Sequence, residues 1–101
     1  MARIVDFHRA ATAEMIDAAR DYERKREGLG FRFIRAVEQS TQRIADHPEV
    51  GAQLGRKDRR WIVFHFPFTV IYRSEQENVL VLAIMHQHRK PGYWKWRRYR
   101  E

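Results

Sequence analysis

The apolar residues of this chain follow one spacing before Pro48 and another spacing beyond Asp58. In the first half they recur every three or four residues, which is typical of amphipathic helices. The two helical stripes are Ala11, Met15, Ala18 and Tyr22, and then Phe33, Val37 and Ile44. In the second half they form short runs rich in β-branched and aromatic residues, which is typical of strands. From Ala11 onwards the sequence therefore predicts helices first and strands afterwards.

Glycine and proline limit the two predicted helices. Gly28-Leu29-Gly30 predicts the end of the first helix, because glycine takes the left-handed conformation at a helix C-terminus at low cost. The second helix is expected from about Phe31 to His47, since Pro48 disfavours helical geometry in the residue before it. The two glycines leave room only for a tight turn. We therefore expect the helices to form an antiparallel hairpin.

The remaining patterns predict strands and define the fold class. The predicted strands are residues 3–8, 60–66, 68–73 and 78–86. The last of these is apolar on both faces, so we expect it to be the most buried strand. Residues 48–58 are expected to form a loop. The fold class is α+β in the order β-α-α-β-β-β, with a helical hairpin packed on one face of a small, mainly antiparallel sheet and a basic C-terminal tail.

Length and composition exclude several classes of protein. A chain of 101 residues suits a single domain, here residues 1–101. The absence of cysteine excludes disulfides and thiolate metal sites and fits a reducing cytoplasm. No apolar run approaches the roughly 18 residues of a membrane span, and the N-terminus has no apolar segment typical of a signal peptide. We expect a cytoplasmic protein without a membrane partner.

The formal net charge of +7 is concentrated in two short stretches. The first 55 residues carry equal numbers of basic and acidic side chains, whereas residues 56–60 and residues 86–101 carry most of the basic excess. The second stretch also holds four aromatic residues, Tyr93, Trp94, Trp96 and Tyr99. Rings offer stacking faces and guanidinium groups offer paired donors, so localised charge of this kind is typical of a binding surface for phosphate or carboxylate groups.

The C-terminal stretch is expected to combine docked and outward residues. A short terminal helix would dock Trp94 on the sheet. The outward side chains would be Trp96, Arg97, Arg98 and Arg100.

A set of short motifs occurs once along the chain, in a defined order. It comprises Phe7-His8, Ala13-Glu14-Met15, Tyr22, Gly28-Leu29-Gly30, Phe33, His47-Pro48, Gly51, Arg59-Arg60, Phe66-Pro67-Phe68, Ile71-Tyr72-Arg73, Val81-Leu82-Ala83, His86, Arg89, Pro91 and Tyr93-Trp94. This set resembles the RelE/ParE superfamily of bacterial type II toxins, and in particular its ParE, or plasmid-stabilisation, branch. The resemblance covers roughly residues 3–94. The tail beyond Trp94 departs from it, because it is longer and more basic.

The resemblance implies a toxin encoded beside a cognate antitoxin that binds and silences it. ParE-like members inhibit DNA gyrase and block replication, whereas RelE-like members cut messenger RNA in the ribosomal A site. Both use one scaffold, so the fold alone does not choose between them. We expect gyrase inhibition by binding, with the RelE-like endoribonuclease as the alternative, and whether the chain is an enzyme stays open.

Two groups of residues are expected to bind the partners. The target would contact His86, Arg89, Tyr93, Trp94 and Arg97. The antitoxin would contact Arg59, Arg60 and Arg73 at the basic edge of the sheet. We expect the antitoxin to present an acidic and apolar C-terminal segment and to form a hetero-oligomer with this chain.

The nuclease alternative needs cations around a scissile phosphate. Its candidate catalytic residues are Lys57, Arg60, Arg89 and Tyr93. The simpler interpretation of the cations at residues 56–60 is a solvated edge that protects an exposed strand from aggregation. The sequence offers no convincing general base in the middle loop, which argues against catalysis.

His86 and His88 lie on one side of an extended segment, a spacing that suits a metal or an acid–base pair. No cysteine is present, and His65 lies on another predicted strand, so no third ligand is evident. We expect no metal and no cofactor, and a hydrogen-bonded His86 near the end of the sheet. A role of His86 as a general acid stays open.

Overall fold

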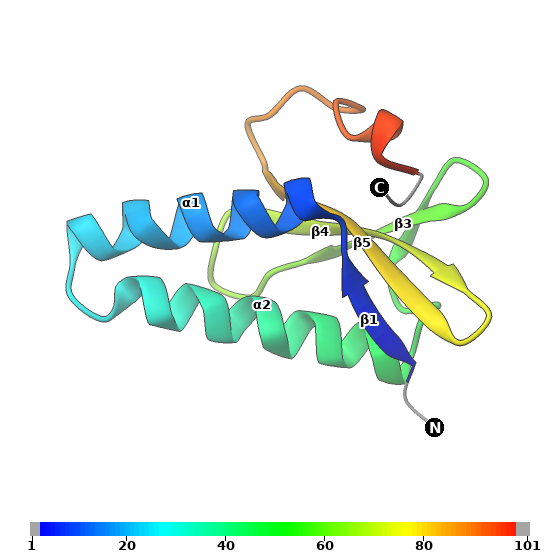
Figure 1. Cartoon of the computed structure of the whole chain (residues 1–101), viewed down its shortest axis with the longest axis horizontal. Coiled ribbons are helices and arrows are strands. Elements are labelled where there is room, and N and C mark those ends of the chain that lie inside the picture. Colours follow the sequence, from blue (N-terminus) through cyan, green and yellow to red (C-terminus); the bar gives the residue numbers. More distant parts are fainter. Residues whose placement is uncertain (1–2, 99–101) are drawn as a thin grey trace.

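A helical hairpin packs against a five-stranded mixed sheet in the computed structural model, which describes residues 3–98 (Figure 1). The elements are β1 (Ile4–Phe7), α1 (Arg9–Lys25), α2 (Leu29–Asp46), β2 (Ala52–Leu54), β3 (Asp58–Ile62), β4 (Phe68–Glu75), β5 (Asn78–His86) and the 3-10 helix η1 (Lys95–Arg98). The predicted α+β class and the order of its elements are confirmed. The expected outward orientation of Arg100 lies outside the described residues.

The turn between the helices is shorter than predicted. Gly28 has the left-handed φ of 85° that the sequence indicated, but α2 already begins at Leu29. Gly30 therefore belongs to the helix and not to the turn. Its role is close approach, because a Cβ atom built there would lie 2.4 Å from the carbonyl oxygen of Ala19 on α1. Glu23 stabilises the turn between α1 and α2, since its carboxylate accepts hydrogen bonds from the backbone N–H groups of Gly28 and Gly30.

The strand order in the sheet is β1-β5-β4-β3-β2. β1 runs parallel to β5, and the other three pairs are antiparallel. The predicted loop before β3 contains the short edge strand β2, which pairs with residues 58–60 of β3. β3 also ends at Ile62 and not at Phe66, because the chain turns at Phe64 and His65, where His65 has a φ of 70°.

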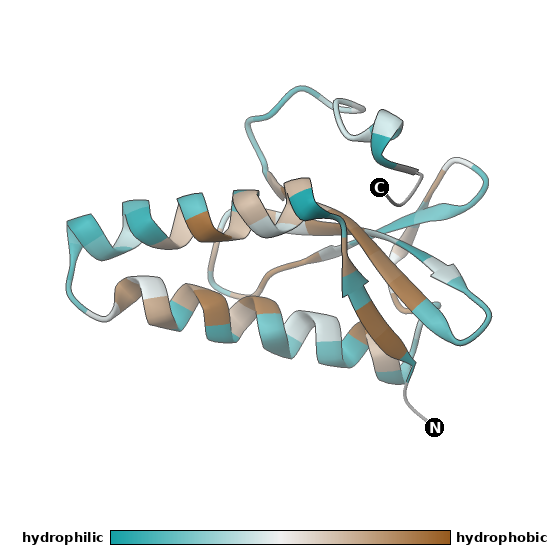
Figure 2. Ribbon diagram, viewed as in Figure 1, coloured by the Kyte–Doolittle hydropathy of each residue, from teal (hydrophilic) through white to brown (hydrophobic). Residues whose placement is uncertain are grey.

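The two faces of the sheet carry different layers. On one face α1 and α2 enclose a core that includes the rings of Phe33, Phe68 and Tyr72. On the other face Ile71, Leu80 and Leu82 pack with Trp94, so the C-terminal segment, residues 87–98, covers this side (Figure 1). β5 contributes to both layers and six of its nine residues are buried, which confirms the prediction for that strand. Figure 2 shows the same strand as strongly hydrophobic and the C-terminal segment as mostly hydrophilic.

Within residues 3–98, no helix is both long enough and apolar enough to cross a bilayer.

The close approach of the helices at Gly30 predicts the effect of adding one methyl group there. Gly30→Ala should destabilise the fold by about 2 kcal/mol, because the new Cβ would meet the backbone oxygen of Ala19 and no rotamer change relieves that clash. The energy of the clash should therefore exceed the gain in helix propensity of about 1 kcal/mol that alanine brings to a helix interior, so that the net effect is destabilising. Urea unfolding measures it, with the exposed Gln39→Ala on the same helix as the control. A Gly30→Ala protein at least as stable as wild type would contradict the packing.

Candidate functional site

Glu14 on α1 joins three separate parts of the chain. Its Oε1 accepts hydrogen bonds from the backbone N–H of Ile84 at 3.0 Å and from Nη1 of Arg97 at 2.9 Å. Its Oε2 accepts a hydrogen bond from the Tyr93 hydroxyl at 2.8 Å. One carboxylate therefore connects α1 with β5 and with the C-terminal segment.

The C-terminal segment is anchored by Trp94, which directly precedes η1, and by Arg97 within η1. A 3-10 helix has three residues per turn, so Trp94 and Arg97 project in the same direction. Trp94 is buried against β5, as predicted. Arg97 is only 7% exposed, and its guanidinium bonds to Glu14 and to the carbonyl oxygen of Leu82. The expectation that Arg97 points outward is therefore wrong, whereas Trp96 is 56% exposed as expected.

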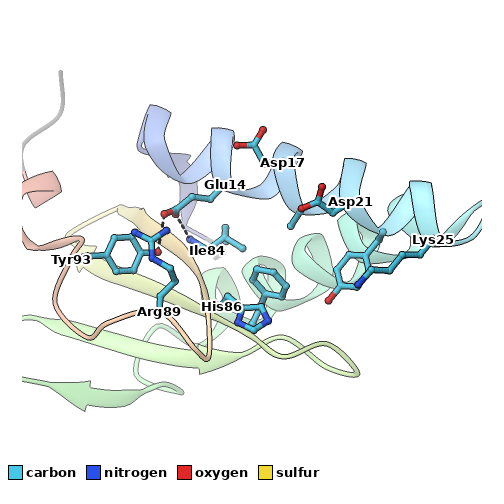
Figure 3. Close-up of a pocket in the computed structure, with 11 residues that line it drawn as sticks. Glu14, Asp17, Asp21, Lys25, Ile84, His86, Arg89 and Tyr93 are labelled. Atoms are coloured by element: carbon cyan, nitrogen blue, oxygen red, sulfur yellow. Dashed lines mark hydrogen bonds between the residues drawn. The ribbon is translucent and has the colours of Figure 1, made fainter.

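A pocket of about 370 Å³ lies between α1 and the start of the C-terminal segment (Figure 3). Three carboxylates from α1 line one wall, those of Glu14, Asp17 and Asp21. Three of the predicted target-binding residues, His86, Arg89 and Tyr93, line the opposite wall. The rings of Tyr22 and Phe68 also line the pocket, so it offers apolar surface between groups of opposite charge.

Ring contacts hold the three predicted residues in place. The Arg89 guanidinium lies 3.8 Å from the centroid of the Tyr93 ring, a cation–π contact, and the Arg89 side chain remains exposed. The ring of His86 is nearly perpendicular to the ring of Phe68, with the two ring centroids 5.0 Å apart. It also stacks with the ring of His88, at a centroid distance of 5.1 Å. The structure thus brings His86, Arg89 and Tyr93 together, while Trp94 and Arg97 act as anchors.

The surroundings of Tyr93 raise the pKa of its phenol above the ordinary value of 10.0. Burial is the largest cause, followed by the hydrogen bond to the Glu14 carboxylate, because both disfavour a second negative charge. The positive charges of Arg89 and Arg97 act in the opposite direction and only partly offset this. Tyr93 is therefore a neutral donor to Glu14 across the physiological range.

The predicted antitoxin-binding cations have different environments. Arg73 pairs with the buried carboxylate of Asp58 at 3.1 Å, and Arg59 donates hydrogen bonds to the carbonyl oxygens of Gly51 and Glu49. These two cations hold the edge of the sheet together. Arg60 is exposed on β3.

The residues of the nuclease alternative are not gathered in one described pocket. Lys57 lines a separate hollow near Asp58, at the end of β3 that pairs with Arg73. Phe68 pairs with His86 at one end of β4, and Arg73 lies five residues further along the same strand. The hollow near Arg73 and the pocket near His86 are therefore about 16 Å apart along β4. Arg60 pairs with Ile71 and so faces the side covered by Trp94, whereas Phe68 belongs to the core under the helices.

His86 and His88 are the pair that the sequence suggested for a metal. Among residues 3–98 no three histidine or carboxylate side chains come together as a possible metal site.

Sequence reasoning about sites overlooked the acidic wall of the pocket. Glu14 follows Ala11 by three residues and precedes Ala18 by four, so it falls within the apolar stripe of α1. A carboxylate on the buried side of a helix needs hydrogen-bond donors, because its transfer from water is otherwise costly. The position of Glu14 within the apolar stripe was therefore the sequence signal that could have identified this site. Asp17 and Asp21 are exposed and continue the same wall.

The sequence and the fold were compared with known protein families and with solved structures. The family model for the ParE toxin of the type II toxin–antitoxin system parDE matches residues 5–91. No curated protein matches the chain. Among solved structures, a chain from the chromosomal ParDE TA system of P. aeruginosa superposes with a TM-score of 0.62 at 14% identity, covering 84% of this chain and 96% of that one. This likeness supports the fold.

A helical hairpin on a small mixed sheet is thus the architecture of the RelE/ParE superfamily. Since the family model covers most of the sequence, the chain belongs to the family of ParE toxins of type II toxin–antitoxin systems.

The raised pKa of Tyr93 predicts a specific loss of stability in alkali. A folded-state pKa above 10.0 means that the stabilising contribution is complete below about pH 10 and is lost as the pH rises further. Tyr93→Phe should lower the free energy of unfolding by about 1–3 kcal/mol at neutral pH, because Glu14 loses a donor. Between about pH 9 and about pH 11 this variant should then lose less stability than wild type. Urea unfolding across that range is the measurement, and parallel declines in the two proteins would contradict the assignment.

Proposed function

We propose that this toxin inhibits DNA gyrase by binding it, without breaking or forming a covalent bond. The observation that carries the proposal is the anchoring of a cationic, ring-bearing segment. Trp94 and Arg97 fix its inner side, and Arg89, Lys95 and Trp96 are exposed on its outer side. Groups that are already ordered lose less conformational entropy on binding, so such a segment suits the recognition of a macromolecule.

The candidate target-binding residues then have two kinds of role. His86, Arg89 and Tyr93 line the pocket beside α1 and would contact the target directly. Trp94 and Arg97 would act by holding the segment, because both side chains are buried. Arg and Trp are common hot-spot residues of protein interfaces, so we expect Arg89 and Trp96 to dominate the affinity.

We also propose that a cognate antitoxin binds this chain and forms a hetero-oligomer with it in the cytoplasm. The solved structure of similar fold comes from a ParDE TA system, which supports a partner of this type. The exposed cations Arg56, Lys57 and Arg60 lie at one edge of the sheet and suit an acidic segment. Arg59 and Arg73 would support that edge through their bonds to Gly51 and Asp58.

A RelE-like, ribosome-dependent cleavage of messenger RNA is the second candidate. The shared pocket of His86, Arg89 and Tyr93 favours it, because it gathers an imidazole, a cation and a phenol in one place. The separation of Lys57 and Arg60 from that pocket weighs against it, since phosphate stabilisation needs the cations around one group. Binding to gyrase therefore remains the function that we propose.

A supercoiling assay with purified gyrase tests the proposal. Wild-type toxin should inhibit supercoiling at micromolar concentrations, and Arg89→Glu should raise the half-inhibitory concentration about tenfold or more, which corresponds to roughly 1.4 kcal/mol. The matched control is Arg20→Glu, an exposed arginine of α1 outside the pocket, which should inhibit like wild type.

Unaffected gyrase at micromolar toxin would refute the proposal, and so would equal inhibition by the two variants. Position-specific cleavage of message on programmed ribosomes, lost in Arg89→Glu, would establish the second candidate instead.

A further inference from the structure

Two phenylalanine rings stand exposed on either side of a hollow that the target and antitoxin assignments do not use. Phe31 at the start of α2 is 65% exposed, and Phe64 at the turn after β3 is 71% exposed. Both line a hollow of about 560 Å³, together with Phe66, whose ring packs edge-on against Phe33. The hollow is therefore an apolar depression that is continuous with the hydrophobic core. Exposed apolar surface of this form is typical of a protein interface.

The backbone at the turn keeps Phe64 on the surface. His65 follows Phe64 and has a φ of 70°, the left-handed region that a residue other than glycine seldom adopts. The imidazole ring of His65 also lies 4.1 Å from the ring of Phe64. Strain of this kind persists only where the surrounding structure maintains it. The turn therefore presents Phe64 in a defined position.

The charge around the hollow has one sign. Arg32 and Arg35 line it from α2, and the Arg35 guanidinium lies 5.9 Å from the centroid of the Phe31 ring. Among the described residues that line it there is no aspartate or glutamate. An occupant that places apolar side chains in the hollow would therefore gain from carboxylates beside them.

We propose that this hollow binds an acidic amphipathic helix of the cognate antitoxin. Two bulky apolar side chains spaced by three or four residues would enter between Phe31 and Phe64, and neighbouring carboxylates would pair with Arg32 and Arg35. The identity of the occupant rests on the proposed function.

The hollow is separate from the basic edge already assigned to the antitoxin. It lies between α2 and the turn after β3, whereas Arg60 pairs with Ile71 and faces the side of the sheet that Trp94 covers. A second copy of this chain is a poorer occupant, because it carries a net charge of +7 and would bring like charge to Arg32 and Arg35.

The test measures the affinity of purified toxin for the antitoxin encoded beside it, by titration calorimetry. Phe31→Ser and Phe64→Ser should each raise the Kd about tenfold or more. Ile4→Ser is the control outside the hollow for both, because Ile4 is 65% exposed, against 65% for Phe31 and 71% for Phe64. This control should bind within twofold of wild type. Arg32→Glu with Arg35→Glu should also weaken binding, and inhibition of gyrase by all these variants should be unchanged.

Equal antitoxin affinity in the phenylalanine variants and in Ile4→Ser would overturn the inference while leaving the proposed function intact. A wild-type toxin that binds no antitoxin would instead refute the proposed partner. A toxin that dimerises through the hollow, with Phe64→Ser monomeric in light scattering, would assign the surface to a second copy and overturn the inference as well. Thermal unfolding of every variant establishes that the exposed substitutions leave the fold in place.

Discussion

The carboxylate of Glu14 is the interaction on which the arrangement of the C-terminal half depends. It lies where α1 meets β5, and it accepts hydrogen bonds from Ile84, Tyr93 and Arg97. Hydrogen bonds to a charged group contribute roughly 1.5–3 kcal/mol each, so together they offset the cost of removing the carboxylate from water. Without this acceptor the Arg97 guanidinium would be a buried charge without a counter-charge. Glu14 therefore holds Tyr93 and Arg97 of the C-terminal segment in place beside α1 and β5.

This arrangement gives the protein separate surfaces with different chemistry. The pocket beside α1 combines carboxylates with Arg89 and aromatic rings. The edge formed by β2 and β3 is basic, and the hollow between α2 and the β3–β4 turn is apolar and basic. These surfaces share no lining residue. Under our proposals a target and an antitoxin each meet surfaces of their own.

The sequence predicted the features that depend on local pattern. The helical hairpin and β5 follow from periodicity within single elements, and the docking of Trp94 follows from its apolar bulk. The features that it missed depend on distant partners. Ala52–Leu54 has no strand pattern of its own and is held by pairing with β3. The parallel pairing of β1 with β5 joins residues about seventy positions apart, for which no local signal exists. Arg97 was expected to point outward, and its burial depends on two distant partners, the Glu14 carboxylate and the carbonyl oxygen of Leu82.

Hydrogen exchange of the C-terminal segment in Glu14→Ala tests most directly whether this carboxylate holds it on the fold. Asp17→Ala, at the exposed neighbouring position of the same pocket wall, is the control. We expect the backbone amides of residues 87–98, and that of Ile84, to exchange about tenfold or more faster in Glu14→Ala. Amides of α2 and β4 should keep their rates, and Asp17→Ala should match wild type throughout. Exchange of the segment in Glu14→Ala within twofold of wild type would contradict the central role of Glu14.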